Sequence, residues 1–268
     1  MSLRAASPPW WVSVVDLGSG YVSVVGVDFM VSIAIIPARL ASTRLPRKIL
    51  QKIAGRPMVG HVYEAAKRSP LLSDVIIATD SEEVMQVAQA SGWKAQMTSS
   101  EHRSGTDRVY EVAQRVKADV YVNVQGDEPL ARPEHFEALL KPMQRAEVMV
   151  STIKTPCPAH DINNPHAVKV VTDKNGRALY FSRSTVPCDR DQRGGIQYFK
   201  HLGFYAYRYA ALERFCNLPE SRLEAAEKLE QLRFLENGID IYVEETPFDT
   251  VGVDSAEDLE RAEELLKR

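Results

Sequence analysis

The sequence predicts an α/β protein with a mainly parallel sheet. From residue 30 to about residue 153, short apolar runs alternate with helical patterns, which is typical of βαβ units. Beyond that point the strands follow one another closely, and Asn175 with Gly176 predicts a tight hairpin turn. The two patterns together predict a parallel sheet that carries an antiparallel insertion over about residues 154–210.

In the first half of the chain we expect strands and helices to alternate. The expected strands cover residues 31–37, 75–79, 120–124 and 148–153. The expected helices cover residues 57–68, 81–91, 106–117 and 133–145. Pro57 fits the first turn of its helix, and Gly92 fits the position that ends the next one.

The second half begins with strands over 168–172 and 177–181 on either side of the hairpin turn, followed by a strand over 202–207. A helix over 224–237 ends at Gly238, and a strand over 239–244 follows. Ser255 opens the last helix, and Asp258 three residues later completes a capping box. The antiparallel segment is of the kind that covers a site or forms a subunit contact.

Composition excludes several classes of protein. The chain has 268 residues, of which 44% are hydrophobic and 26% charged, as in ordinary globular proteins. A formal net charge of -3 argues against a nucleic-acid binder, which usually carries a basic surplus. Three widely spaced cysteines, Cys157, Cys188 and Cys216, predict neither a disulfide framework nor structural zinc, and favour a cytoplasmic protein.

Residues 1–29 differ from the rest of the chain. They are rich in Val, Ser and Gly, they lack the apolar core of a signal peptide, and Asp28 interrupts any membrane span. We expect an accessory leader over 1–29, with a genuine edge strand as the alternative, and a domain over 30–268. We expect no membrane partner.

The most informative segment is IIPARLASTRLPRK, residues 35–48. A strand ends at Pro37, and the loop that follows contains Arg39, Arg44, Arg47 and Lys48 without an acidic residue. Ligands of open α/β sheets lie beyond the carboxyl ends of the strands, so these cations predict a polyphosphate or polyacid ligand. The alternative is a solvated basic loop. Neither GxxxxGK[ST] nor GxGxxG is present, which weakens kinase and dinucleotide-binding interpretations.

A second segment, VNVQGDEP, residues 122–129, joins an apolar strand to two adjacent carboxylates. Asp127 and Glu128 at a strand end suit a hard cation such as Mg2+, and Gly126 allows close approach of the backbone. Asp127 is the stronger candidate. The alternative is a structural cap before Pro129.

A third segment, HRSGTDR, residues 102–108, is a polar loop that opens a helix. Ser104 and Gly105 can present hydroxyl and backbone groups to a pyrimidine, although a plain N-cap explains Ser104 equally well. Thr79 and Asp80 follow a strand and form a less specific nucleotide-binding candidate.

Later segments suit an acidic ligand with hydroxyl groups. FSRS places Arg183 at the end of a strand, and KHLGFYAYR places His201 and Tyr205 four residues apart, on one face of a strand. Arginine pairs well with a carboxylate. The alternative is an aromatic core strand with a satisfied histidine. In VGVDSAEDL, Asp254 precedes the helix-capping Ser255. Taken alone, this pattern indicates only the start of a helix.

These segments resemble the 3-deoxy-manno-octulosonate cytidylyltransferase family. The matching motifs are PARxxSTRLPxK, SGT[DE]R, QGDEP, FSRS, LEQLR and GVDxxEDL, and the resemblance spans about residues 31–267. It implies a nucleotide-diphospho-sugar transferase type of α/β fold, Rossmann-like, in a homodimer. One departure is Arg47, which stands where many relatives carry glycine.

The resemblance assigns roles to individual residues. It implies catalytic roles for Arg39, Arg44, Lys48 and Asp127. It implies nucleotide contacts from Pro37, Ala38, Arg39, Arg103, Ser104, Gly105, Gln125 and Gly126. It implies sugar contacts from Arg183, His201, Tyr205, Glu230 and Gln231, and Mg2+ ligands at Asp127 and Asp254.

The implied reaction uses CTP and 3-deoxy-manno-octulosonate, supplying the activated sugar for bacterial lipopolysaccharide. The anomeric hydroxyl attacks the α-phosphorus of CTP in line, so that catalysis consists of positioning and charge neutralisation. Three alternatives remain: a cytidylyltransferase for another 2-keto acidic sugar, a catalytically silent protein that keeps the fold, and a glycosyltransferase. The last would normally carry an Asp-x-Asp metal motif.

Overall fold

The computed structural model describes residues 14–16, 22–24, 30–40 and 45–267. The chain divides into two compact units, Met1–Met30 and Val31–Arg268. In the first unit, β1 (Val14–Asp16) and β2 (Val22–Val24) pair antiparallel in a sheet of their own. The interpretation of residues 1–29 as an accessory leader stays a prediction.

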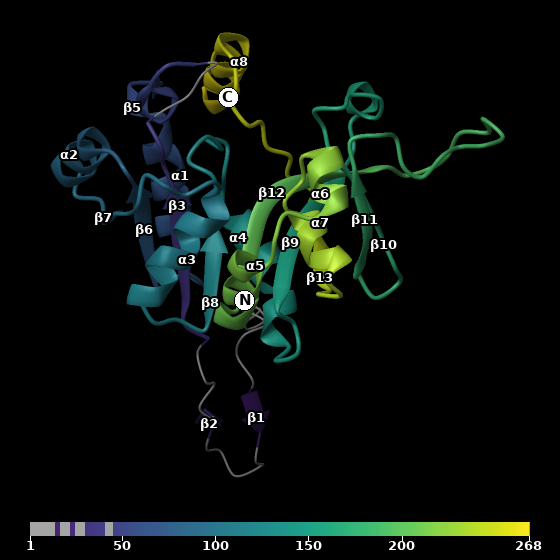
Figure 1. Cartoon of the computed structure of the whole chain (residues 1–268), viewed down its shortest axis with the longest axis horizontal. Coiled ribbons are helices and arrows are strands. Elements are labelled where there is room, and N and C mark those ends of the chain that lie inside the picture. Colours follow the sequence, from purple (N-terminus) through teal and green to yellow (C-terminus); the bar gives the residue numbers. More distant parts are fainter. Residues whose placement is uncertain (1–13, 17–21, 25–29, 41–44, 268) are drawn as a thin grey trace, which may run out of the picture. The chain divides into compact units, whose positions relative to one another are not determined.

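The second unit contains the main sheet and all the described helices (Figure 1). Its strands are β3 Ser32–Pro37, β4 Lys52–Ile53, β5 Arg56–Pro57, β6 Asp74–Thr79, β7 Ala95–Met97, β8 Val120–Asn123, β9 Val150–Pro156, β10 Lys169–Thr172, β11 Ala178–Ser182, β12 Phe199–Tyr207 and β13 Ile241–Glu245. Its α-helices are α1 Met58–Lys67, α2 Glu82–Ala90, α3 Gly105–Arg115, α4 Pro133–Leu140, α5 Tyr209–Asn217, α6 Arg222–Glu227, α7 Gln231–Glu236 and α8 Ala256–Leu266. Short 3-10 helices cover Lys48–Leu50, Pro142–Gln144 and Ala159–Asp161.

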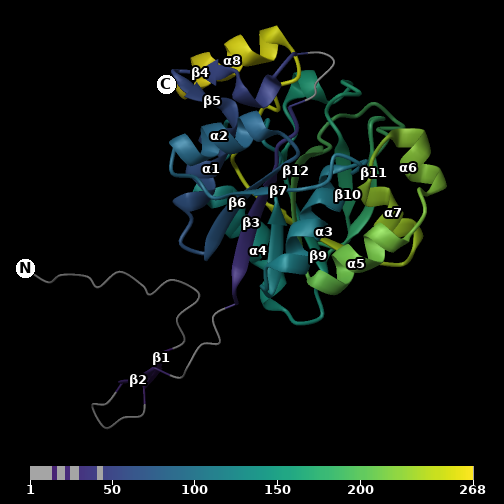
Figure 2. The same ribbon diagram turned by 60° about the vertical axis from the view of Figure 1, so that its left-hand side comes forward.

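One half of the sheet is parallel, with the neighbours β7, β6, β3 and β8 in that order. The connection from β3 through α1 to β6 crosses the sheet in one direction, and that from β7 through α3 to β8 crosses it in the other. Right-handed crossovers therefore place α1 and α3 on opposite faces, as Figure 2 shows. The strand order reverses at β3 and β8, and the carboxyl ends of two such strands form the usual ligand crevice.

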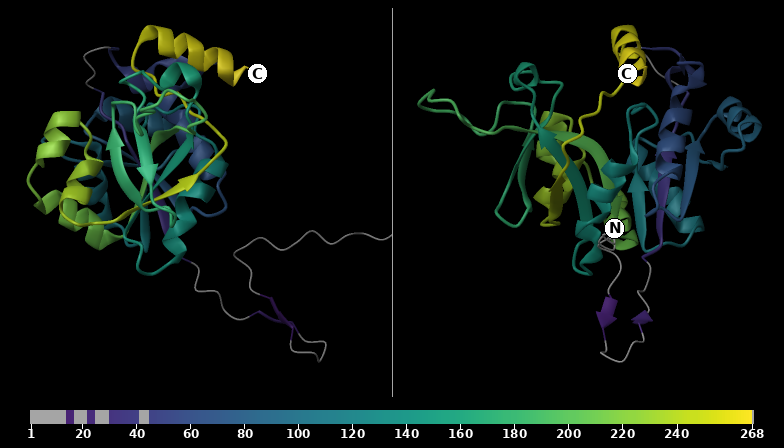
Figure 3. Two further views of the ribbon diagram at one scale, coloured as in Figure 1. Left: turned by 90° about the vertical axis from the view of Figure 1, so that its right-hand side faces the viewer. Right: turned by 180° about the vertical axis from the view of Figure 1, so that it is seen from behind.

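The other half of the sheet is largely antiparallel (Figure 3). Strand β12 lies between β8 and β9, because Tyr205 pairs with both Asn123 and Thr152. The β10–β11 hairpin joins β12 through Lys169, and β13 pairs parallel with β9. The predicted α/β fold with a mainly parallel sheet and an antiparallel segment is confirmed, and the last strand of that segment is part of the main sheet.

Two predicted helices are shorter than expected. The helix expected over 133–145 ends at Leu140, and Pro142 begins a 3-10 helix, since proline cannot continue the α-helical hydrogen bonds. The helix expected over 224–237 is two helices, because Lys228 adopts a left-handed conformation with φ 52° and ends α6. Pro57 is the N-cap of α1 instead of its first helical residue. Strand β7 and helix α5 were not predicted.

Two hydrophobic clusters stabilise the second unit. The larger lies between the sheet and the helices α3, α5 and α7, with Tyr121, Phe215 and Phe234 among its buried residues. The smaller joins Ile53 and Met58 to Val253 and Ala262. It therefore fixes α8 beside the segment that follows β3.

Candidate active site

A cavity of about 990 Å³ lies beside the carboxyl ends of β3 and β8 and extends along β12 to α7. Ten of the residues predicted from the sequence line it: Arg39, Arg103, Ser104, Gly105, Gln125, His201, Tyr205, Glu230, Gln231 and Asp254. One cavity thus joins residues from segments that are far apart in the sequence.

The wall between β3 and β8 is made of closely packed backbone. The Gly126 amide donates to the Pro37 carbonyl at 3.3 Å, and a Cβ atom on Gly126 would lie 3.1 Å from the same oxygen. The Ala38 amide donates to Ala78, and Thr79 Oγ1 donates to the Ala38 carbonyl at 2.5 Å. Pro37, Ala38, Thr79 and Gly126 therefore support the cavity from beneath and lie outside its described lining.

Lys48 bridges the two carboxylates that the sequence predicts to meet. Its Nζ donates to Asp127 Oδ2 at 2.5 Å and to Asp254 Oδ1 at 2.8 Å. The backbone brings these residues together, since the Val253 amide donates to the Asp127 carbonyl at 2.9 Å. Burial opposes the charge on Lys48, but attraction to both carboxylates leaves its pKa above the ordinary value.

Glu128 faces the cavity beside Asp127 but differs from it chemically. It accepts a hydrogen bond from Thr250 Oγ1 at 2.9 Å. Burial, with added repulsion from Asp127, raises the pKa of Glu128 to about 8. Asp127 stays the stronger candidate for a metal ligand, because it shares the Lys48 ammonium with Asp254, whereas Glu128 is held by Thr250.

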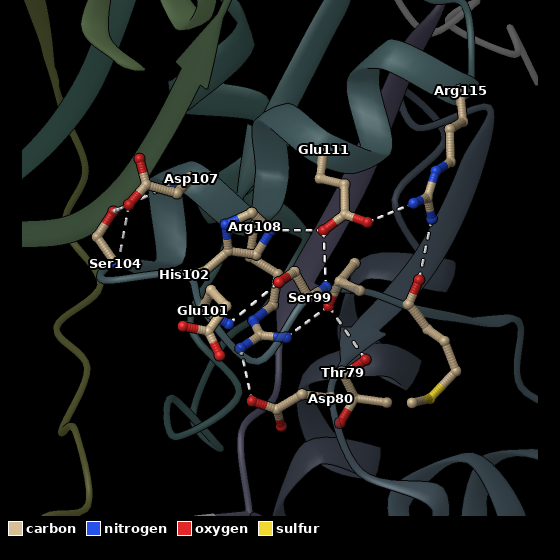
Figure 4. Close-up of polar contacts among 12 residues, drawn as sticks. Thr79, Asp80, Ser99, Glu101, His102, Ser104, Asp107, Arg108, Glu111 and Arg115 are labelled. Atoms are coloured by element: carbon tan, nitrogen blue, oxygen red, sulfur yellow. Dashed lines mark hydrogen bonds and ion pairs between the residues drawn. The ribbon is translucent and has the colours of Figure 1, made fainter. Parts of the chain in front are cut away.

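The loop before α3 is fixed by a network of ion pairs (Figure 4). Arg108 pairs with Asp80 at 2.9 Å and donates to Thr98 Oγ1. Glu111 accepts hydrogen bonds from the Ser99 amide at 2.8 Å and pairs with His102. Arg108 thus fixes Asp80 and Thr98, and Glu111 fixes Ser99 and His102, which lie in the loop before α3. In the described structure Asp80 anchors Arg108 and does not line the cavity.

Ser104 is the N-cap of α3. Its hydroxyl and the carboxylate of Asp107 form a complete capping box, so the structural alternative for Ser104 is confirmed. Ser104 nevertheless lines the cavity together with Gly105, where a Cβ atom would lie 3.0 Å from Gln125 Nε2. A larger residue at Gly105 would therefore displace the Gln125 amide at the end of β8.

Aromatic rings surround the histidine of β12. The ring centroids of His201 lie 5.0 Å from Phe181 and 5.4 Å from Tyr205, so the predicted shared face of His201 and Tyr205 is confirmed. Burial lowers the pKa of His201 to about 3, and its ring is neutral at physiological pH. Thr152 Oγ1 uses its one proton on the Phe204 carbonyl at 2.6 Å, so His201 Nε2–H donates to that oxygen at 2.9 Å.

Two buried polar atoms in this part of the cavity lack a partner. The Tyr205 hydroxyl and Gln231 Nε2 have no hydrogen-bond partner among the described residues. Next to them, Glu230 Oε2 accepts from Thr106 Oγ1 at 3.0 Å. Buried polar groups are nearly always paired in native proteins, and both residues line the cavity, so a polar ligand in the cavity would supply the missing partners.

The other predicted residues lie elsewhere. Arg183 is outside the described cavity lining, and its guanidinium donates to the carbonyls of Pro165, Glu227 and Lys228 at 3.0, 2.7 and 3.3 Å. Arg44 lies outside the described residues. Arg47 pairs with Glu83 and has φ 55°, a left-handed conformation that glycine adopts without strain.

Sequence reasoning missed several residues of the cavity. Asn123, Lys200 and Thr106 line it, and Thr106 donates to Glu230. Asn123 Oδ1 accepts from Gln125 Nε2 at 2.9 Å and orients that amide. A polar residue inside the apolar run of β8 was the available signal for Asn123.

The described residues contain neither a membrane-spanning helix nor a preformed metal site. No described helix is long and apolar enough to cross a membrane. No group of three or more His, Cys, Asp or Glu side chains within the described ranges could hold a metal ion by itself.

Comparison with known proteins gives consistent results. The cytidylyltransferase family matches residues 33–241. The chain is 68% identical over 236 residues to the 3-deoxy-manno-octulosonate cytidylyltransferase of Koribacter versatilis (strain Ellin345), covering 88% of this chain and 90% of that one. It is 58% identical to the protein of the same name from Acidobacterium capsulatum, covering 87% of this chain and 96% of that one.

Solved structures confirm the predicted fold type. The structure of CMP:2-keto-3-deoxy-manno-octonic acid synthetase complexed with CTP matches with a TM-score of 0.85 at 44% identity, covering 88% of this chain and 98% of that one. A glucose-1-phosphate thymidylyltransferase from Bacillus anthracis matches with a TM-score of 0.61 at 16% identity, covering 87% and 94%. The second likeness supports the nucleotide-diphospho-sugar transferase fold alone.

Proposed function

The chain belongs to the 3-deoxy-manno-octulosonate cytidylyltransferase family, and from that premise we propose that its cavity transfers CMP from CTP to the anomeric hydroxyl of 3-deoxy-manno-octulosonate, releasing pyrophosphate. The observation that carries the proposal is the single cavity that joins the loops after β3 and β8 to β12 and α7. We call the part near Arg39, Ser104 and Gln125 the nucleotide end. The part near Tyr205 and Gln231 is the sugar end.

At the nucleotide end, the cationic loop after β3 binds the triphosphate. Arg39 is exposed at the cavity wall, and Lys48 lies at its edge. Positive groups that are fixed near the leaving pyrophosphate stabilise the charge that develops as the bond to the α-phosphorus breaks. The amide of Gln125, held by Asn123, and the loop that carries Arg103, Ser104 and Gly105 recognise the cytosine. Arg44 is proposed to act with Arg39 on the triphosphate.

Asp127 and Asp254 fit a magnesium ion. The Lys48 ammonium already occupies the position of a cation between them, within 2.8 Å of both carboxylates. Mg2+ is usually bound through one or two carboxylates together with substrate phosphates, so two protein ligands suffice. When bound, Mg2+ supplies charge neutralisation at the α-phosphate and lowers the pKa of a coordinated hydroxyl.

At the sugar end, hydrogen-bond donors and acceptors on β12 and at the start of α7 bind hydroxyls. His201 donates through Nε2 to Thr152, which leaves Nδ1 as an acceptor. The Tyr205 hydroxyl and Gln231 Nε2 supply donors, and the Glu230 carboxylate supplies an acceptor. A ligand with several hydroxyl groups therefore satisfies both unpaired atoms. Arg183 reaches no such position in the described structure, and its predicted contact with the sugar carboxylate stays a prediction.

We also propose a homodimer and a cytoplasmic location. Leu179 of β11 is 57% exposed, which is consistent with a subunit contact on the antiparallel segment. All three cysteines are free thiols, as expected in a reducing compartment. Light scattering during size-exclusion chromatography tests the dimer: a mass of one chain at every protein concentration would contradict it.

The reaction is tested by incubating the protein with CTP, Mg2+ and 3-deoxy-manno-octulosonate and identifying the product by mass spectrometry. We expect the CMP-sugar and pyrophosphate in equal amounts. Parallel reactions with the 8-amino analogue and with a sialic acid measure discrimination among 2-keto acidic sugars. Turnover of a sialic acid alone would identify a different cytidylyltransferase, and no turnover of any sugar would favour a catalytically silent protein.

A further inference from the structure

Lys169 is fully buried and is the first residue of β10. Its Nζ donates to the carbonyls of Asn164, Ala167 and Arg183 at 2.8, 2.6 and 2.8 Å. An ammonium group has three donors, so all of them are used on backbone oxygens. Burial lowers the pKa of Lys169, and a buried charge is tolerated only where polar groups compensate it.

The carbonyls of Asn164 and Ala167 belong to a segment that lines the cavity. Asn164, His166, Ala167 and Val168 all contribute to the lining, and the Val168 carbonyl accepts from the His201 amide at 2.8 Å. Three carbonyl oxygens that converge on one point repel one another without a cation between them. Lys169 therefore fixes the segment 164–168 against the strand that carries His201.

The third carbonyl, that of Arg183, connects Lys169 to the helices α6 and α7. Arg183 donates to the carbonyls of Glu227 and Lys228, the residues at the end of α6, and to Pro165 in the segment 164–168. A basic side chain at a helix C-terminus stabilises the last carbonyls of that helix. Glu230 and Gln231 follow two and three residues after Lys228, so the end of α6 determines where they enter the cavity.

We propose that Lys169 is a positioning residue for the sugar end: acting through its three carbonyls and through Arg183, it holds the segment 164–168 and the start of α7 at the distance from β12 that the acceptor sugar requires. Lys169 does not touch the substrate, since it is absent from the described cavity lining. The inference rests on the proposed function for the identity of the sugar. The structural effect on the segment 164–168 does not depend on it.

The test compares Lys169→Met with Lys154→Met. Methionine keeps much of the side-chain volume and removes the donors. Lys154 is a matched control, because it is 9% exposed on β9 of the same sheet, donates to Thr172 Oγ1 at 3.0 Å, and lies outside the described cavity lining. We expect Lys169→Met to raise the KM for 3-deoxy-manno-octulosonate about tenfold or more. The Kd for CTP should change less than about twofold, which is below 0.5 kcal/mol.

Hydrogen exchange of the ligand-free protein gives a readout that needs no substrate. In Lys169→Met we expect faster exchange in peptides that cover 162–168 and 183–186, and unchanged exchange in β3, β6 and β8. Lys154→Met should show neither the KM change nor the faster exchange. Unchanged sugar KM in Lys169→Met, or an equal loss of CTP binding, would overturn the inference.

Lys169→Gln is the second variant if methionine prevents folding, because glutamine keeps two donors at a shorter reach. It should fold and show a smaller rise in the sugar KM with normal CTP binding, and a normal sugar KM would overturn the inference. If the wild-type protein makes no CMP-sugar but Lys169→Met still loosens the segment 164–168, the proposed function fails and the positioning contact stands.

Discussion

At the nucleotide end of the cavity the carboxylates are paired, whereas at the sugar end two buried polar atoms have no partner in the described chain. Lys48 binds Asp127 and Asp254, and Ser104 binds Asp107. By contrast, the Tyr205 hydroxyl and Gln231 Nε2 are buried and unpaired. The carboxylates of the nucleotide end therefore have partners without ligand, and these two atoms of the sugar end do not.

This difference has a thermodynamic consequence. A ligand at the nucleotide end must compete with existing ion pairs, so its binding exchanges one set of charged contacts for another. A ligand at the sugar end supplies partners to groups whose unpaired burial costs about 1–3 kcal/mol each. Substitutions at the two ends should therefore separate effects on turnover from effects on stability and sugar binding.

The largest effect is expected at the nucleotide end, for Asp127→Asn. The change keeps size and shape but removes a charge from the proposed metal ligand, and we expect kcat to fall about 10²- to 10³-fold while the fold survives. Steady-state kinetics over a range of Mg2+ concentrations measures this. Asp240→Asn is the control, because Asp240 is exposed and pairs only at 3.5 Å with Arg177.

Wild-type turnover of Asp127→Asn at every Mg2+ concentration would contradict the metal role. Loss of folding, detected by circular dichroism, would favour the structural cap.

The next effect is expected for Arg183→Ala at the sugar end. A charged donor to several carbonyls contributes roughly 1.5–3 kcal/mol to folding, so the melting temperature should fall, and the sugar KM should rise because the segments that Arg183 joins lose their anchor. Binding of CTP, followed by calorimetry, should be nearly unchanged. An equal loss of CTP binding would place Arg183 with the nucleotide end or the core.

A smaller and more diagnostic effect is expected for Tyr205→Phe. Removal of an unpaired buried hydroxyl should leave the ligand-free protein as stable or slightly more stable, and should raise the sugar KM by about 3- to 10-fold. Tyr121→Phe is the matched control. Its hydroxyl is already paired, accepting from the Ala118 amide at 3.0 Å and donating to the Val116 carbonyl at 2.9 Å.

Tyr121→Phe should therefore lower the free energy of unfolding by about 1 kcal/mol without changing the sugar KM. Chemical denaturation and kinetics on both variants measure the contrast. The same loss of stability in Tyr205→Phe would mean that its hydroxyl has a protein partner.

The smallest effect is expected for a chain that begins at Met30. The described cavity lining begins at Arg39, and the family match begins at residue 33. We expect turnover and solubility equal to those of the full chain within experimental error. A loss of either would make residues 1–29 an integral part of the fold.

Different signals in the sequence predicted the two ends of the cavity, for physical reasons. Strand ends in a parallel sheet converge on one crevice, so local motifs after β3 and β8 were enough to place Arg39 and Gln125 together. The sugar end depends on β12, which reaches its place through long-range pairing with both β8 and β9. Only the resemblance to a family indicated Glu230 and Gln231.

Other details required the structure itself. The sequence could not show that Arg183 bonds to backbone carbonyls instead of a sugar, because those carbonyls belong to the distant residues 165, 227 and 228. The break between α6 and α7 depends on the left-handed backbone conformation of Lys228. Lysine rarely adopts this conformation, so the sequence does not predict the break. The role of Asp80 in anchoring Arg108 depends on a contact 28 residues along the chain.

Hydrogen exchange with each substrate alone tests the central claim most directly, namely that the two ends of the cavity serve two different substrates. CTP with Mg2+ should slow exchange in the segments 36–40, 98–108 and 124–128. The octulosonate should slow exchange in 164–168, β12 and α7 and leave the first set unchanged. Protection of one common set of peptides by both ligands would contradict the division of the cavity.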